Sequence, residues 1–179
     1  RSRAAAAAMP CALDALLDCE IAQQHLDAAA VATQLVTLLI GGSETLPKLV
    51  AGGARELARH PDQRAALARE PAQILAAFEE VVRHQGVLQA VGRTALREFE
   101  IGGIRVRPGQ RLFLLLQSAN RDEREFESPD RFDIYRRPRR HLGFGQGPHH
   151  CIGIHLARME GRALLSELVA RIPEWEVDE

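Results

Sequence analysis

Residues 143–153, Gly-Phe-Gly-Gln-Gly-Pro-His-His-Cys-Ile-Gly, constrain the fold more than any other stretch of this chain. Three glycines precede Cys151, and an apolar helical pattern follows it. Glycine lets the backbone curl tightly, and a helix N-terminus favours negative charge. A thiolate is stabilised by backbone N–H groups and nearby positive charge. The stretch therefore predicts a loop that holds a metal through the single sulfur of Cys151.

The spacing Phe-Gly-x-Gly-x-His-x-Cys-x-Gly resembles the haem-ligand signature of the cytochrome P450 family, the haem-thiolate monooxygenases. The resemblance implies that Cys151 is the axial ligand of the iron in haem b (iron protoporphyrin IX), where electron donation from the thiolate favours O–O cleavage. It also implies that His149 binds a haem propionate and that Phe144 shields the sulfur from water. The signature is filled at every fixed position: Phe144, Gly145, Gly147, His149, Cys151 and Gly153.

Two other interpretations of Cys151 stay open at this point. A free cysteine is often only a small buried hydrophobe, although such a residue needs no glycine-rich approach. A zinc site is the sharper alternative, because several ligand-type residues lie close in sequence. Structural zinc sites usually pair their ligands as C-x₂₋₄-C or H-x₃₋₅-H, and the chain has no such cysteine pair. The residues in question are His141, His149, His150, Cys151 and His155.

Composition narrows the classes of partner and compartment. The net charge of −1 gives no general attraction to nucleic acid or to an anionic membrane. Three cysteines indicate a reducing compartment, so we expect a cytoplasmic protein. No run approaches the ~18 apolar residues of a membrane span, which resembles the soluble bacterial type of the family. Residues 1–10 are expected to be a cloning-derived addition or a frayed lead-in to a helix.

Hydrophobic periodicity predicts a mainly α fold with a small antiparallel β-sheet, resembling the C-terminal core of the P450 fold. Strands are expected over residues 87–116, with turns at Gly102-Gly103 and Pro108-Gly109. Residues 120–150 are expected to be irregular. Helices are expected over residues 11–53, 60–69, 71–84 and 151–171. The expected buried faces are Ile74, Leu75, Phe78, Val81 and Val82 on the third helix, and Leu156, Leu164, Leu165, Leu168 and Ile172 on the last.

The segment Gly41-Gly42-Ser43-Glu44-Thr45 lies inside the first predicted helix. Adjacent glycines cost about 1 kcal/mol each relative to alanine, and they permit either a plain kink or the close approach of a ligand. The segment resembles the family's oxygen-binding stretch. The resemblance implies that Gly42 lies close to the cofactor, and that Thr45 and Glu44 serve oxygen activation and proton delivery.

Glu80 and Arg83 are three residues apart on a predicted helix, a spacing that brings their side chains together. Such a pair is often only a solvated surface contact. The flanking valines indicate burial, which requires the two charges to be paired. In the family this pair is completed by an arginine of a Pro-x-Arg-Phe segment. The resemblance therefore assigns Arg131 as the third, structural member.

Other arginines have roles implied by the resemblance. Arg93 is expected to bind a haem propionate, to which a guanidinium is geometrically suited. A basic cluster precedes the cysteine loop and is expected to attract an acidic electron donor of the ferredoxin or flavodoxin type. A solvated charged face is the plainer interpretation. The cluster consists of Arg136, Arg137, Arg139 and Arg140.

The resemblance runs from about residue 20 to the last residue, but the chain is less than half as long as a usual family member. We therefore expect residues 1–179 to be a single partial domain lacking the family's N-terminal half. The first hypothesis is a monooxygenase acting on a small organic substrate that the sequence does not identify. The second is a truncated, non-catalytic fragment or interaction module that binds haem weakly or not at all. Exposed apolar surface would favour self-association or a second chain.

Overall fold

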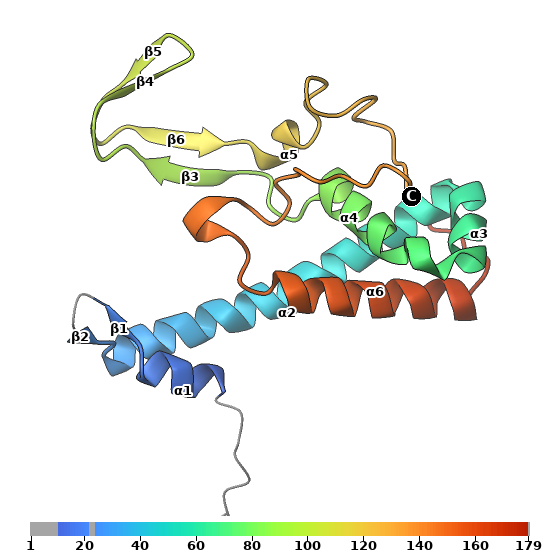
Figure 1. Cartoon of the computed structure of the whole chain (residues 1–179), viewed down its shortest axis with the longest axis horizontal. Coiled ribbons are helices and arrows are strands. Elements are labelled where there is room, and N and C mark those ends of the chain that lie inside the picture. Colours follow the sequence, from blue (N-terminus) through green and yellow to red (C-terminus); the bar gives the residue numbers. More distant parts are fainter. Residues whose placement is uncertain (1–10, 22–23, 179) are drawn as a thin grey trace, which may run out of the picture. The chain divides into compact units, whose positions relative to one another are not determined.

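The computed structural model describes residues 11–21 and 24–178 of the chain. The expectation for residues 1–10 lies outside these residues. Contacts divide the chain into two units, residues 1–44 and 45–179. The helix α2 (Ala28–Arg59) runs from the first unit into the second (Figure 1).

Among its described residues, the first unit holds three short elements before α2: α1 (Ala12–Leu17), β1 (Glu20–Ile21) and β2 (Gln24–His25). The prediction of one helix over residues 11–53 is therefore wrong in its first part. The side chain of Asp27 accepts a hydrogen bond from the Ala30 N–H at 2.7 Å. An aspartate in this position satisfies a donor that the first helical turn leaves unpaired, so it marks a new helix start. Helix α2 then continues without a break through Gly41, Gly42 and Pro47.

The second unit is built around α4 (Ile74–Gln85) and α6 (Ile154–Arg171), which pack against each other. Phe78 is fully buried between them, because Gly161 has no side chain: a Cβ there would lie 2.2 Å from the Phe78 ring. Burying one such ring contributes about 1.5–3 kcal/mol. Helix α3 (Pro61–Arg69) and the 3₁₀ turn η1 (Pro71–Gln73) precede α4, and both begin at the prolines that predicted them.

The buried faces agree with the periodicity on α4 better than on α6. Ile74, Phe78, Val81 and Val82 are at most 1% exposed, whereas Leu75 is 40% exposed. On α6 the predicted face is correct only for Leu165, with Leu168 partly buried. Ile154, Gly161 and Val169 are the other buried residues of α6, which leucine spacing alone did not reveal. Three predicted members of that face are exposed instead: Leu156, Leu164 and Ile172.

The strands form antiparallel pairs, as predicted. β3 (Val91–Thr94) pairs with β6 (Arg111–Leu114), with Arg93 opposite Leu112. β4 (Phe99–Ile101) pairs with β5 (Ile104–Val106) through Gly102-Gly103, whose φ angles of 58° and 76° are those that a tight hairpin turn requires. The short helix α5 (Leu116–Ala119) follows β6.

A long irregular segment connects α5 to the 3₁₀ turn η2 (Gly147–His149) and then to α6, as expected for residues 120–150. Long loops in compact domains are usually functional. This one contacts both α3 and α4, because Gln63 of α3 and Glu80 and Arg83 of α4 bind its backbone. The segment is therefore fixed by buried polar side chains rather than by secondary structure of its own.

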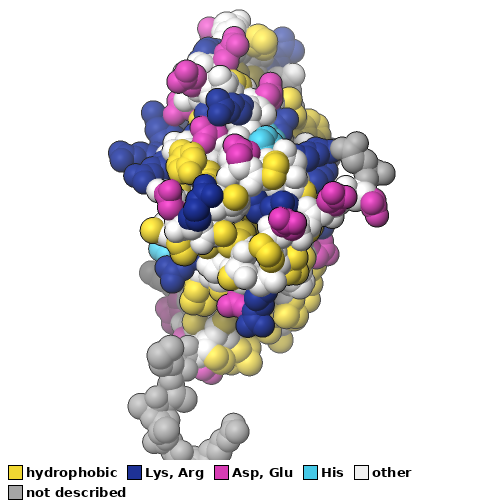
Figure 2. Space-filling model, turned by 90° about the vertical axis from the view of Figure 1, so that its right-hand side faces the viewer, with side chains coloured by type: hydrophobic (Ala, Val, Ile, Leu, Met, Phe, Trp, Pro, Cys, Tyr) yellow, Lys and Arg dark blue, Asp and Glu magenta, His cyan; other side chains and the backbone are white. Residues whose placement is uncertain are grey.

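Two surface properties bear on partners. Lys and Arg side chains are interspersed with Asp and Glu on the face shown in Figure 2, with hydrophobic side chains between them. Helix α2 is long and apolar enough, by length and composition, to cross a membrane. Core helices of soluble proteins and signal sequences meet the same criteria of length and composition.

Candidate functional site

The loop before α6 curls back on itself at Cys151. The Cys151 N–H donates to the Phe144 carbonyl at 2.8 Å, and the Gly145 N–H donates to the Leu142 carbonyl at 2.9 Å. Gly145 and Gly147 have φ angles of 72° and 68°, which side chains rarely tolerate. These two glycines therefore permit the curl that the sequence predicted.

Cys151 lies just before the N-terminus of α6 in the sequence. The helix begins at Ile154 rather than at Cys151, with Gly153 as its N-cap. A Cβ at Gly153 would lie 4.0 Å from the Cys151 sulfur, so the thiol lies at the amino end of the helix. Cys151 is half-buried.

Glu80 and Arg83 form a fully buried ion pair on α4. Arg83 donates from Nε and Nη2 to the two carboxylate oxygens of Glu80, each at 2.7 Å, and both side chains are 0% exposed. Arg83 Nη1 also donates to the carbonyls of Asn120 and Pro129, each at 2.8 Å. The paired arrangement predicted from Glu-x-x-Arg is present, and it ties the irregular segment to α4.

The third member of this cluster is Arg136, not Arg131. Arg136 Nε donates to Glu80 at 3.1 Å, and its side chain is only 11% exposed. Arg131 is exposed and contributes its carbonyl oxygen, which accepts from Arg136 at 3.0 Å. The prediction for Arg131 is wrong because the backbone of the segment turns the later arginine inward. Arg136 is thereby removed from the predicted exposed basic cluster.

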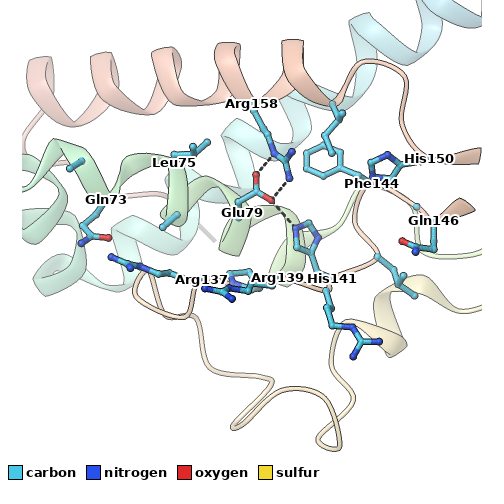
Figure 3. Close-up of a pocket in the computed structure, with 17 residues that line it drawn as sticks. Gln73, Leu75, Glu79, Arg137, Arg139, His141, Phe144, Gln146, His150 and Arg158 are labelled. Atoms are coloured by element: carbon cyan, nitrogen blue, oxygen red, sulfur yellow. Dashed lines mark hydrogen bonds and ion pairs between the residues drawn. The ribbon is translucent and has the colours of Figure 1, made fainter.

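A second charged cluster on α4 was not predicted. Glu79 accepts hydrogen bonds from Arg158 Nε at 2.6 Å and from His141 Nε2 at 2.9 Å (Figure 3). Burial raises the pKa of Glu79, but the hydrogen bonds from His141 and Arg158 outweigh it, so the pKa lies below its ordinary value. The same pairing raises the pKa of Arg158. No local pattern signalled this cluster, because the partners lie 62 and 79 residues further along the chain.

The remaining predicted site residues are found on separate elements. Arg93 on β3 and His149 in η2 are exposed, and the Arg93 guanidinium donates to the neighbouring Gly92 carbonyl at 2.8 Å. Thr45 on α2 is half-buried and belongs to the second unit. Gly42 and Glu44 are exposed and belong to the first. The roles assigned to these residues stay predictions.

The zinc alternative required several ligands to converge around Cys151. Within residues 11–21 and 24–178, no group of three or more His, Cys, Asp and Glu side chains is arranged to hold a metal ion. His141 instead binds Glu79.

Comparison with known proteins decides the family. The cytochrome P450 family model matches residues 7–177. The chain belongs to the cytochrome P450 family. Similar curated proteins include cytochrome P450 105A3 of Streptomyces carbophilus, 38% identical over 162 residues, and cytochrome P450 130 of Mycobacterium tuberculosis, 42% identical over 145 residues. These alignments cover 90% and 80% of this chain but 40% and 36% of the relatives.

Solved P450 structures share the fold. The substrate-free structure of CYP109E1 from Bacillus megaterium matches with a TM-score of 0.84 at 31% identity, covering 92% of this chain and 43% of that one. CYP109Q5 from Chondromyces apiculatus matches with a TM-score of 0.79 at 40% identity, covering 87% and 40%. The chain therefore spans about two fifths of the length of the P450s it matches.

Haem is the cofactor of P450 family members, and the residues present fit it. The cysteine loop offers one half-buried thiol at a helix N-terminus. Three consecutive large apolar side chains at the end of β6 and just after it are also exposed. These are Phe113, Leu114 and Leu115, which are 71%, 42% and 58% exposed.

Proposed function

We propose that this chain carries the haem-binding core of a haem-thiolate monooxygenase, which inserts one oxygen atom of O₂ into a small organic substrate. The Cys151 loop, placed at the start of α6 in a P450 fold, is the observation that carries the proposal. A relative of Streptomyces fradiae, 37% identical over 163 residues, is named a 23-monooxygenase. We further propose a cytoplasmic location, as for a soluble bacterial P450.

The residues of this chain would divide the work. Cys151 would ligate the iron, and the exposed Arg93 and His149 would bind the propionates. When bound, the haem supplies oxygen activation by donation from the thiolate. Thr45 and Glu44 of α2 would serve oxygen activation and proton delivery. Phe144 would keep water from the sulfur. Gly42, Gly145 and Gly153 would allow the backbone to come close to the cofactor.

The electron donor would be a ferredoxin or flavodoxin with an acidic surface. Three exposed arginines support this: Arg137, Arg139 and Arg140 line a hollow that residues of α4, the cysteine loop and α6 also line. Figure 3 shows Arg137 and Arg139 in this hollow. A positive patch accelerates encounter with an acidic partner, and the effect weakens with salt.

Charge reversal of these three arginines tests the docking face. Replacing all three by Glu is expected to slow reduction of the haem-loaded chain by about tenfold or more at low salt, and to flatten its salt dependence. The matched control is Arg105→Glu, which reverses a 71% exposed arginine on the β4–β5 hairpin. An unchanged reduction rate would refute docking at this face.

Haem titration tests the proposed function itself. One equivalent of haem is expected to bind the wild-type chain, and Arg93→Ala and His149→Ala are each expected to weaken binding by about threefold to thirtyfold. Supplying the donor, O₂ and a panel of small organic substrates should then yield oxygenated product. A chain that binds no haem would refute the proposal.

A second candidate is a haem-binding or interaction module without turnover. Exposed apolar side chains on α6 favour it, since Leu156, Met159 and Leu164 are 51%, 63% and 45% exposed. Such a surface favours self-association or a second chain. Haem binding without product from any substrate would support this candidate over the first.

A further inference from the structure

Phe144 is held by contacts that the cysteine signature does not describe. The Arg158 guanidinium carbon lies 5.4 Å from the centroid of the Phe144 ring, within the range of a cation–π contact. The His141 ring lies 5.8 Å from the same centroid, tilted by 50°. Both residues are bound by the Glu79 carboxylate (Figure 3). One carboxylate on α4 thus fixes two side chains that contact this ring.

The backbone of Phe144 in turn holds the cysteine. Its carbonyl accepts the Cys151 N–H at 2.8 Å. The turn that leads to Phe144 lies on α4, because a Cβ at Gly143 would lie 2.4 Å from Val82. The Gly143 N–H also donates to Nδ1 of His141 at 3.2 Å, and His141 in turn binds Glu79 of α4. A displacement of His141 would therefore be transmitted through the turn to the peptide that binds Cys151.

We propose that Glu79 is a positioning residue for the thiolate: by holding Arg158 and His141 against Phe144, it sets the orientation and the solvent access of the Cys151 sulfur. Glu79 acts through these side chains and does not contact Cys151. The consequence for a bound haem rests on the proposed function, whereas the consequence for the thiol of the haem-free chain does not.

Burial makes the arrangement suited to this role. The side chains of Glu79 and His141 are 15% and 5% exposed, and that of Arg158 is 36% exposed. Arg158 donates to Glu79 from two nitrogens, Nε at 2.6 Å and Nη2 at 3.1 Å. Such a bidentate pair fixes the guanidinium plane as well as its distance. A neutral amide at position 79 would weaken the interactions with His141 and Arg158 and leave the side-chain volume almost unchanged.

The first test uses the haem-free chain with Cys11 and Cys19 replaced by Ser, so that Cys151 is its single thiol. Iodoacetamide is added under native conditions, and the rate of Cys151 alkylation is measured. Glu79→Gln is expected to raise this rate by about threefold to tenfold, because the loop opens more often. The matched control is Glu167→Gln, which removes an exposed carboxylate from the Glu167–Arg171 pair on α6. It is expected to leave the rate unchanged.

The second test asks whether Glu79 acts through the ring. In a Phe144→Leu background, Glu79→Gln should raise the alkylation rate by less than twofold, since the two effects are not independent. In the haem-loaded chain, Glu79→Gln should shift the ferric/ferrous midpoint potential, whereas Glu167→Gln should not. A merely structural role would move the unfolding midpoint without moving the potential.

Three results would overturn the proposal: equal alkylation rates for Glu79→Gln and Glu167→Gln, an undiminished effect in the Phe144→Leu background, or an unshifted potential. If Glu79→Gln does not fold, Arg158→Gln replaces it, and an unchanged alkylation rate there is equally decisive. A wild-type chain without a thiolate-type haem spectrum would refute the proposed function alone, because the alkylation test needs no haem.

Discussion

At the scale of single residues, the two neighbouring glutamates of α4 have different tasks. Glu80 is fully buried and accepts from Arg83, from Arg136 and from the Asp133 N–H. Glu79 lies nearer the surface and binds residues of the cysteine loop and of α6. Buried charges are retained only where they are paired and hydrogen-bonded. The first carboxylate therefore holds the irregular segment, and the second holds the thiol loop.

Removing the Glu80 charge should destabilise the second unit severely. Glu80→Gln leaves Arg83 buried without its counter-charge, and such losses cost about 3–5 kcal/mol. Urea unfolding can be followed by the fluorescence of Trp175, the single tryptophan, whose indole N–H donates to the Ala54 carbonyl at 2.9 Å. Glu167→Gln should leave the urea midpoint almost unchanged. A Glu80→Gln chain as stable as the wild type would contradict the buried pairing.

The sequence anticipated residues whose partners are close in the chain and missed those whose partners are distant. Cys151, its glycines, and the Glu80–Arg83 pair follow from local spacing. Glu79 could not be singled out, because its partners His141 and Arg158 come from other elements. Arg136 was misassigned for a related reason: it lies in the same irregular segment as Arg131, and only the course of the backbone decides which arginine faces Glu80.

At the scale of elements, the loop before α6 is shaped by its fit to α4. Gly143 allows the turn to lie directly on Val82: a Cβ at Gly143 would lie 2.4 Å from a Val82 methyl carbon and 2.9 Å from the Val82 carbonyl oxygen. The Leu142 N–H donates to the Asn120 side chain at 2.6 Å, which adds a second attachment. Hydrophobic periodicity predicted the helices, but the close contact of Gly143 with Val82 depends on tertiary packing.

Filling that contact should displace the loop. Gly143→Ala is expected to destabilise the second unit by about 1–3 kcal/mol, the usual effect of overpacking. The matched control is Gly92→Ala on β3, where an added Cβ meets nothing within 4 Å. Both are measured by urea unfolding. Equal stability of the two variants would show that the turn does not lie on α4 as described.

The attachment of the loop to α4 should also weaken in acid. Because the folded-state pKa of Glu79 lies below its ordinary value of 4.5, its stabilisation is complete above about pH 4.5 and is lost as the pH falls through the folded-state pKa. Burial lowers the pKa of His84 below 6.5, so the fold also loses stability as the pH falls below about 6.5, where the unfolded chain takes up this proton more readily than the folded chain. This loss begins at a higher pH than the loss due to Glu79. The test therefore compares the free energy of unfolding of the wild type and of Glu79→Gln as a function of pH. The two curves should differ in slope only below about pH 4.5, where the curve of Glu79→Gln should be flatter. Parallel profiles of wild type and Glu79→Gln would contradict this.

At the scale of the whole molecule, the chain is a P450 core that spans about two fifths of the relatives it matches. Its α6 buries Leu165 and Val169 on one face and exposes Leu156, Met159 and Leu164. Apolar residues on both faces of a helix indicate further packing partners. The leucines were predicted to form one buried face, so the second face became visible only in the fold.

Self-association should follow from this exposed face. Sedimentation velocity of the purified chain is expected to show dimers or larger species whose share rises with concentration. The double variant Leu156→Ser, Met159→Ser is expected to shift the distribution towards monomer. Ile104→Ser on the β4–β5 hairpin, where Ile104 is 69% exposed, serves as the matched control. Monomers at every concentration would contradict association through α6.

The most direct measurement is the absorption spectrum of the haem-loaded chain after reduction under carbon monoxide. If the Cys151 sulfur is the ligand, the wild-type chain and the Cys11→Ser, Cys19→Ser variant will show the red-shifted Soret band typical of thiolate-ligated haem, and Cys151→Ala will not. A Cys151→Ala chain that keeps this band would contradict the assignment of the iron ligand and, with it, the proposed function.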